Sequence, residues 1–168
     1  QYYYINYVRK NNVISLKTGV NKLIKELQKK KVRQFIVTSS SKKQATLIIN
    51  QLFKELNPFE FIISSDDVPF HKPNPLPYLK AIKLSGIKFN KSIVFEDSIP
   101  GLRSSLAAKL PTIYVPSNIP AVIDRDMDLD CFIDSLGNES CKANVIKGPK
   151  LDSNYVDFAY LEKYLMTL

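Results

Sequence analysis

The fold is decided by the stretch Ile93-Val94-Phe95-Glu96-Asp97-Ser98-Ile99-Pro100-Gly101-Leu102, in which an apolar strand ends on two adjacent carboxylates. We expect the strand over 93–95, a sharp turn at Pro100-Gly101 and a helix over 101–109. In open α/β sheets ligands bind at the carboxyl ends of parallel strands, which is where Glu96 and Asp97 would lie. Carboxylate oxygens suit a hard divalent cation, so the sequence predicts that Glu96 and Asp97 hold Mg2+.

The flanking segments alternate between short apolar strands and amphipathic helices. Strands are expected over 35–37, 59–63, 112–115 and 131–136, and helices over 2–12, 20–31, 42–56, 75–85 and 155–165, with an extended connector over 13–18 and a loop over 142–154. Strands that alternate with helices of this length are typical of an α/β fold. We therefore predict a Rossmann-like, doubly wound parallel sheet with right-handed crossovers.

The composition restricts the class of protein. A chain of 168 residues with 45% hydrophobic and 24% charged residues is long enough for one domain with a real core. The net charge of +8 favours a small anionic partner, but Lys and Arg are scattered, so nucleic acid is not a predicted partner. No apolar run approaches the length of a membrane span, so no membrane partner is expected either.

The chain has two cysteines, Cys131 and Cys141, ten positions apart. This spacing fits neither a zinc site nor a disulfide scaffold, so we expect two idle or buried thiols. A reducing compartment follows as the default, either the cytoplasm or the interior of an organelle. We also expect a monomer.

Two further segments carry candidate site residues. Thr38-Ser39-Ser40-Ser41 follows a predicted strand and precedes a helix, where hydroxyl groups and backbone N–H groups cradle phosphate. Capping of the helix would explain the same residues equally well. In His71-Lys72-Pro73-Asn74-Pro75 the prolines stiffen the turn that carries Lys72, whose fixed ammonium suits a phosphoryl group. Taken alone, Lys72 is also explained as a solvated lysine in a loop.

A third segment, Ser64-Ser65-Asp66-Asp67-Val68, carries two adjacent acids that could bind a metal ion. We interpret it as a turn instead. His71 is interpreted as a neighbour of the site and not as a functional group.

In this order along the chain, the segments resemble the motifs of the haloacid dehalogenase (HAD) superfamily, in its β-phosphoglucomutase-like branch with the CbbY-type sugar-phosphate phosphatases. Motif II resembles Ile36-Val37-Thr38-Ser39-Ser40, motif III resembles Lys72-Pro73-Asn74-Pro75, and motif IV resembles Val94-Phe95-Glu96-Asp97-Ser98 with Gly101-Leu102. The resemblance spans about residues 2–115. It implies that residues 1–15 are a remnant of a helical cap with its connector and that residues 16–168 are the C-terminal portion of a HAD-like core.

The chain departs from the family at motif I, the Asp-x-Asp on the family's first strand. Asp124-Arg125-Asp126 and Asp128-Leu129-Asp130 have this spacing, but they follow no buried strand. In the family the motif I strand is central, between the strands that here end at Thr38 and Glu96. Without it, we expect two half-sheets about 10 Å apart with unpaired facing edges, which should not fold alone. We therefore expect the chain to be the C-terminal part of a longer phosphatase.

The resemblance implies Mg2+-dependent hydrolysis of a small sugar phosphate through an aspartyl-phosphate intermediate, with the nucleophile on that missing segment. It implies that Asp97 and Glu96 support Mg2+, that Thr38 and Ser39 bind phosphoryl oxygens, and that Lys72 balances charge. Lys72→Ala should then reduce turnover strongly without unfolding the protein. A phosphosugar mutase of the same branch, a pseudophosphatase and a non-catalytic binding module remain alternatives. A response-regulator receiver is disfavoured, because its acids would lie earlier in the chain than the Lys.

Overall fold

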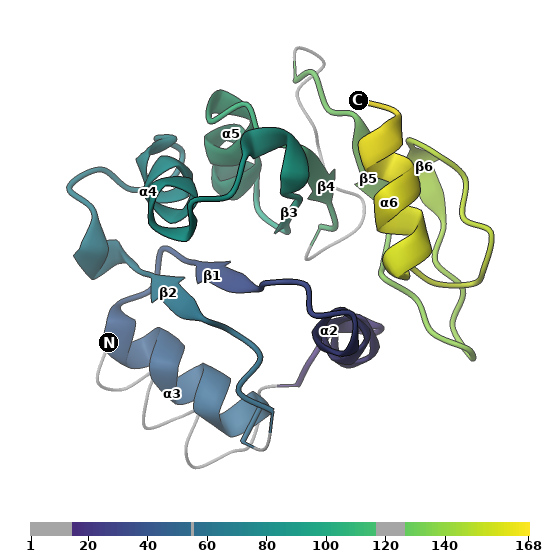
Figure 1. The fold of residues 1–168 in the computed structure, drawn as a ribbon, viewed down its shortest axis with the longest axis horizontal. Coiled ribbons are helices and arrows are strands. Elements are labelled where there is room, and N and C mark those ends of the chain that lie inside the picture. The colour runs from purple at the N-terminus through teal and green to yellow at the C-terminus, as the bar shows by residue number, and fades with distance from the viewer. Residues whose placement is uncertain (1–14, 55, 117–126) are drawn as a thin grey trace.

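A computed structural model describes residues 15–54, 56–116 and 127–168, and its elements follow the predicted alternation of strands and helices (Figure 1). The predicted helix over 2–12 and Asp124-Arg125-Asp126 lie outside the described residues. The described helices are not long and apolar enough for any of them to cross a membrane. The α-helices are α2 (Val20–Lys29), α3 (Lys42–Leu52), α4 (Leu76–Ser85), α5 (Ile99–Ala107) and α6 (Phe158–Met166).

The strands form two sheets. Their bounds are β1 (Phe35–Val37), β2 (Phe61–Ile63), β3 (Val94–Glu96), β4 (Thr112–Tyr114), β5 (Cys131–Ile133) and β6 (Val145–Lys147), and two short 3-10 turns are η1 (Ser65–Asp67) and η2 (Phe89–Lys91). Strand β1 pairs in parallel with β2, and β3, β4 and β5 are parallel neighbours, with β6 antiparallel at the edge. In Figure 1, α4 and α5 lie on one side of the strands and α3 lies on the other. The predicted α/β fold with a parallel sheet is confirmed.

Strands β1 and β3 are not paired with each other within the described residues. This is the arrangement expected for two half-sheets whose facing edges lack a strand between them. Helix α4 nevertheless connects the two strands through side-chain packing. Val37 of β1 and Val94 of β3 both pack against a buried cluster formed by Tyr78, Ala108 and Leu110. Tyr78 lies on α4, so this helix contacts the last residue of β1 and the first residue of β3.

Two local predictions were wrong. Pro100-Gly101 does not form a turn, because both residues lie in the first turn of α5. Ser98 caps this helix by accepting a hydrogen bond from the Gly101 N–H at 3.2 Å, and proline is tolerated at the start of a helix because its missing N–H has no partner there. The predicted loop over 142–154 contains β6, which pairs with β5 as an antiparallel strand.

The main core lies between β4, β5, α2 and α6. Tyr164 is fully buried there, and its hydroxyl donates to the carbonyl of Thr112 at 3.2 Å. Cys131 is also buried, with its Sγ 3.3 Å from the hydroxyl of Tyr160, while Cys141 is exposed. Both thiols are unbridged, as predicted. This core fixes the strands on which one half of the candidate site is built.

Candidate active site

The ammonium of Lys72 joins the ends of the two sheets. Its Nζ donates to the carbonyl of Val37, at the end of β1, at 2.9 Å, and it also donates to the carboxylate of Glu96, at the end of β3. The side chains of Lys72 and Glu96 are only 8% and 5% exposed. The interpretation of Lys72 as a solvated loop lysine is therefore excluded. Its charge is instead held at a fixed point between two strand ends.

Tyr78, on the first turn of α4, is a site residue that sequence reasoning missed. Its hydroxyl hydrogen-bonds the same Oε1 of Glu96 that receives Lys72, and it lies 3.2 Å from Lys72 Nζ. Burial, and then the charge of Glu96, raise the pKa of Tyr78 far above its ordinary value, so the phenol keeps its proton. In the sequence Tyr78 is one of several aromatic residues on helical faces, and nothing local separates it from a core residue.

The carboxylate of Glu96 lies against the start of α5. A Cβ added at Gly101 would overlap this carboxylate, so glycine is required for the close approach. The hydroxyl of Ser98 lies 3.5 Å from Glu96 Oε2. The N-terminal end of a helix also favours a negative charge. Glu96 thus accepts hydrogen bonds from Lys72 and Tyr78 and lies closely against Gly101 at the start of α5.

Asp97 has a different environment from Glu96. Its side chain is 56% exposed, and its Oδ2 lies 3.6 Å from Nζ of Lys17. Lys17 also donates to the carbonyl of Pro116, at 3.3 Å, beyond the end of β4. Of the two predicted metal ligands, Asp97 is the accessible one. Its oxygens match the ligand preference of Mg2+, but no group of three or more His, Cys, Asp or Glu residues in the described part of the chain is arranged to hold a metal ion.

Thr38 and Ser39 lie between β1 and α3. The Thr38 N–H continues the sheet by donating to the carbonyl of Ile63 at 2.8 Å, and its hydroxyl accepts from the Ser40 N–H at 3.1 Å. The cap of α3 is Ser41, in a reciprocal capping box with Gln44. Helix capping therefore explains Ser41 but not Thr38 or Ser39. Because Thr38 follows Val37, whose carbonyl binds Lys72, Thr38 and Lys72 belong to the same edge of the fold.

The acids of the segment 64–68 form a turn, as interpreted from the sequence. Asp67 accepts hydrogen bonds from the backbone N–H and the hydroxyl of Ser64, at 2.7 and 2.6 Å. These bonds, with Lys42 nearby, hold the pKa of Asp67 below its ordinary value. Asp66 accepts from the Lys42 N–H at 2.9 Å. His71 is exposed beside the site residue Lys72.

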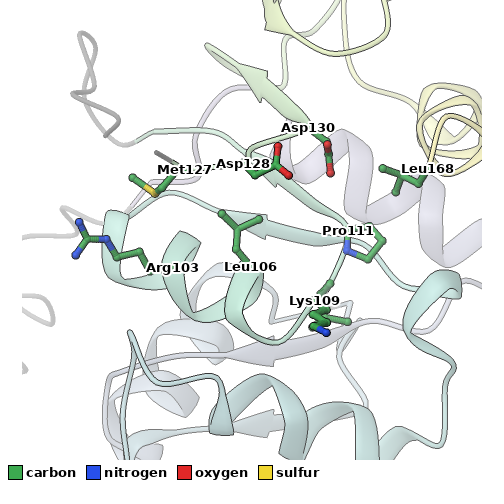
Figure 2. Close-up of a pocket in the computed structure, with 9 residues that line it drawn as sticks. Arg103, Leu106, Lys109, Pro111, Met127, Asp128, Asp130 and Leu168 are labelled. Carbon is green, nitrogen blue, oxygen red and sulfur yellow. The ribbon is translucent and has the colours of Figure 1, made fainter. Parts of the chain in front are cut away.

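A pocket of about 520 Å3 lies elsewhere in the molecule (Figure 2). Pro111 immediately precedes β4, and Asp128 and Asp130 precede β5, so the pocket lies at the amino ends of these strands. Thr38, Glu96 and Asp97 lie at the carboxyl ends of their strands. The pocket is therefore separate from the candidate site, and Asp128-Leu129-Asp130 lies at the wrong end of the sheet to serve it. Its lining residues are Arg103, Leu106, Lys109, Leu110, Pro111, Met127, Asp128, Asp130 and Leu168.

The sequence model of the haloacid dehalogenase-like hydrolase family matches residues 1–115. A phosphoglycolate phosphatase of Nitrosococcus oceani is 30% identical over 119 residues, covering 70% of this chain and 52% of the relative. The protein CbbY of Rhodobacter capsulatus is 32% identical over 106 residues, covering 62% of this chain and 47% of the relative. The chain thus spans about half the length of these relatives.

The fold is also similar to that of solved structures. The crystal structure of CbbY from Rhodobacter sphaeroides in complex with phosphate superimposes with a TM-score of 0.70 at 24% identity. The match covers 79% of this chain and 59% of that protein. At this identity the likeness supports the fold, and it agrees with the match to the family.

Proposed function

Because the chain belongs to the haloacid dehalogenase-like hydrolase family, we propose that it forms part of a Mg2+-dependent phosphatase that acts on a small sugar phosphate. The observation that carries the proposal is the placement of Lys72. Its buried ammonium is held between the ends of β1 and β3, at the edge that also presents Thr38 and Asp97. A charge that is fixed before the reaction stabilises a transferring phosphoryl group without reorganisation.

The phosphoryl group would bind at the start of α3. Thr38 would contribute its hydroxyl and Ser39 its backbone N–H, because the end of β1 directs both residues toward the N-terminal end of this helix. Lys72 would then offset the negative charge of the phosphoryl oxygens. Phosphate is bound in the similar CbbY structure, and xylulose-1,5-bisphosphate is bound in another structure of that protein. These ligands make a small phosphorylated metabolite the substrate class that we propose.

Asp97 is the residue that we assign to Mg2+, because it is the accessible carboxylate of the adjacent pair. Glu96 would support the metal ion indirectly, through water, while its own carboxylate orients Lys72. When bound, Mg2+ would offset the repulsion between an anionic nucleophile and the phosphate. Mg2+ would then replace Lys17 as the cation nearest to Asp97.

The nucleophile would come from a strand with an Asp-x-Asp sequence that pairs between β1 and β3. The unpaired facing edges of the two described sheets support this placement, as does Lys72, which already links their ends. Attack by the first carboxylate would form an aspartyl phosphate and release the alcohol, and water would then hydrolyse this intermediate. On this proposal the described residues from 16 onward belong to the C-terminal portion of the catalytic core.

The test uses the protein expressed from its complete reading frame. We expect Mg2+-dependent release of phosphate from p-nitrophenyl phosphate and, faster, from at least one member of a panel of sugar phosphates. Lys72→Met should lower this activity by about two orders of magnitude, as expected for loss of a fixed charge at the phosphoryl group. Lys83→Met, at an exposed position of α4, is the matched control. Absence of Mg2+-dependent phosphate release from every substrate would overturn the proposal.

A further inference from the structure

The proposed roles leave one buried polar group of the site unused, the hydroxyl of Tyr78. The residue is 5% exposed, and its ring lies 4.9 Å from the ammonium of Lys72. A buried hydroxyl must be hydrogen-bonded to avoid a large desolvation cost, and both of its partners here are charged. The hydroxyl bonds Glu96 Oε1 and lies 3.2 Å from Lys72 Nζ. Its contacts therefore connect it to the two ions on which the candidate site depends.

Each N–H donor of the Lys72 ammonium has an acceptor within the site. An ammonium has three N–H donors, and three acceptors surround this one: the Val37 carbonyl, Glu96 Oε1 and the Tyr78 hydroxyl. The first two acceptors are a strand carbonyl and a buried carboxylate. The third is a neutral oxygen at 3.2 Å, the longest of the contacts. It is the partner that Lys72 can most readily exchange for a phosphoryl oxygen.

We propose that Tyr78 is a positioning residue of the phosphatase site: its hydroxyl donates to Glu96 and accepts the third N–H of Lys72 until a phosphoryl oxygen replaces it. Before substrate binds, this contact keeps the third N–H of Lys72 available for a phosphoryl oxygen. The ammonium does not direct all of its free donors to Glu96. A phenol hydroxyl can donate one hydrogen bond and accept another at the same time, as this role requires. This inference rests on the proposed function. It adds Tyr78, a residue outside the segments that resemble motifs II, III and IV.

Tyr78→Phe removes only the hydroxyl, and Tyr164→Phe is the matched control. Tyr164 is also buried and also donates one hydrogen bond, but it lies on α6 and bonds a backbone carbonyl of β4 in the main core. In the complete protein we expect Tyr78→Phe to lower kcat about tenfold, as for one lost hydrogen bond to a charged group, with KM changed less than about threefold. Tyr164→Phe should leave kcat within about twofold. An equal loss of kcat in both variants, or no loss in Tyr78→Phe, would overturn the proposal.

A second readout separates this proposal from the proposed function. In 15N NMR spectra, the resonance of the Lys72 ammonium is assigned by its absence in Lys72→Met. Its chemical shift should change in Tyr78→Phe and stay the same in Tyr164→Phe. This measurement needs no substrate, so it tests the role of Tyr78 even if the wild-type protein releases no phosphate. An unchanged Lys72 signal in Tyr78→Phe contradicts the positioning role.

Rescue by a conservative variant covers the case in which Tyr78→Phe does not fold. The amino group of 4-aminophenylalanine at position 78 keeps a donor within reach of Glu96. We expect a kcat within about threefold of wild type, since the hydrogen bond to the carboxylate is retained. A tenfold loss of kcat in this variant would contradict the proposal.

Discussion

Lys72 and Glu96 form a buried ion pair across 24 positions of sequence, with side chains 8% and 5% exposed. Removal of one partner of such a pair leaves an uncompensated charge in a site with little water, which typically costs about 3 kcal/mol or more. The expectation from the sequence, that Lys72→Ala lowers turnover without unfolding the protein, takes no account of this burial. The pairing changes it, because stability and turnover now depend on the same ammonium.

We expect Lys72→Met to destabilise the complete protein by about 3 kcal/mol, and Lys72→Met/Glu96→Gln to recover more than half of this loss, because the double variant buries no unpaired charge. Urea denaturation measures both values. The activity should stay low in both variants, since neither supplies a cation to the phosphoryl group. A double variant as unstable as Lys72→Met would contradict the buried-pair explanation, and a double variant with restored turnover would contradict the role of Lys72.

Gly101→Ala is expected to destabilise the protein by about 1–3 kcal/mol, because the added Cβ overlaps the Glu96 carboxylate. In a Glu96→Ala background the obstacle is gone, and alanine is the better helix former. There the same substitution should stabilise the protein by about 0.5 kcal/mol. A double-mutant cycle followed by thermal unfolding tests this reversal of sign. The same sign in both backgrounds would show that the side chain of Glu96 does not limit position 101.

Asp97→Asn should weaken Mg2+ binding at least tenfold while changing the free energy of unfolding by less than about 0.5 kcal/mol, since its side chain is 56% exposed. Lys17→Gln removes the cation 3.6 Å from Asp97, so Mg2+ affinity should rise about twofold to threefold. Isothermal titration with MgCl2 measures both effects. Unchanged Mg2+ affinity in Asp97→Asn would remove Asp97 from the proposed metal site.

Asp67 gives a pH dependence of stability. Hydrogen bonds from Ser64, and then the charge of Lys42, hold the pKa of Asp67 below 3.8, its ordinary value. The folded state therefore binds this proton less readily than the unfolded chain does. The resulting stabilisation is complete above pH 3.8 and is lost as the pH falls through the lowered folded pKa.

Asp67→Asn should thus be less stable than wild type by about 1 kcal/mol at pH 7, and the difference should shrink as the medium is acidified below pH 3.8. Urea denaturation over this range measures it. Asp152→Asn, at a side chain that is 84% exposed and paired with Lys163, controls for loss of a surface charge. A difference for Asp67→Asn that is constant with pH would contradict the assignment.

Most of the fold could be predicted because its signals are local. The strand Phe35–Val37 was predicted with its observed bounds, and the helix of α2 differed only in its last residues, since apolar spacing and flanking polar residues act within a few positions. The turn predicted at Pro100-Gly101 was wrong because proline and glycine are typical both of turns and of the start of a helix. Only the cap contributed by Ser98 decides between these two outcomes.

The sequence by itself determined which residues lie at the strand ends, because Thr38, Glu96 and Asp97 each follow an apolar run that stops at a polar side chain. It also indicated Lys72, through the prolines that follow this residue. Only the tertiary structure decided how these residues are used. The burial of Lys72 against Glu96 and the place of the Tyr78 hydroxyl between two ions depend on the contacts that β1, β3 and α4 make with one another. The exposure of Asp97 is likewise visible only in the folded chain. Charge in a folded protein acts according to its surroundings, and those surroundings come from segments far apart in the chain.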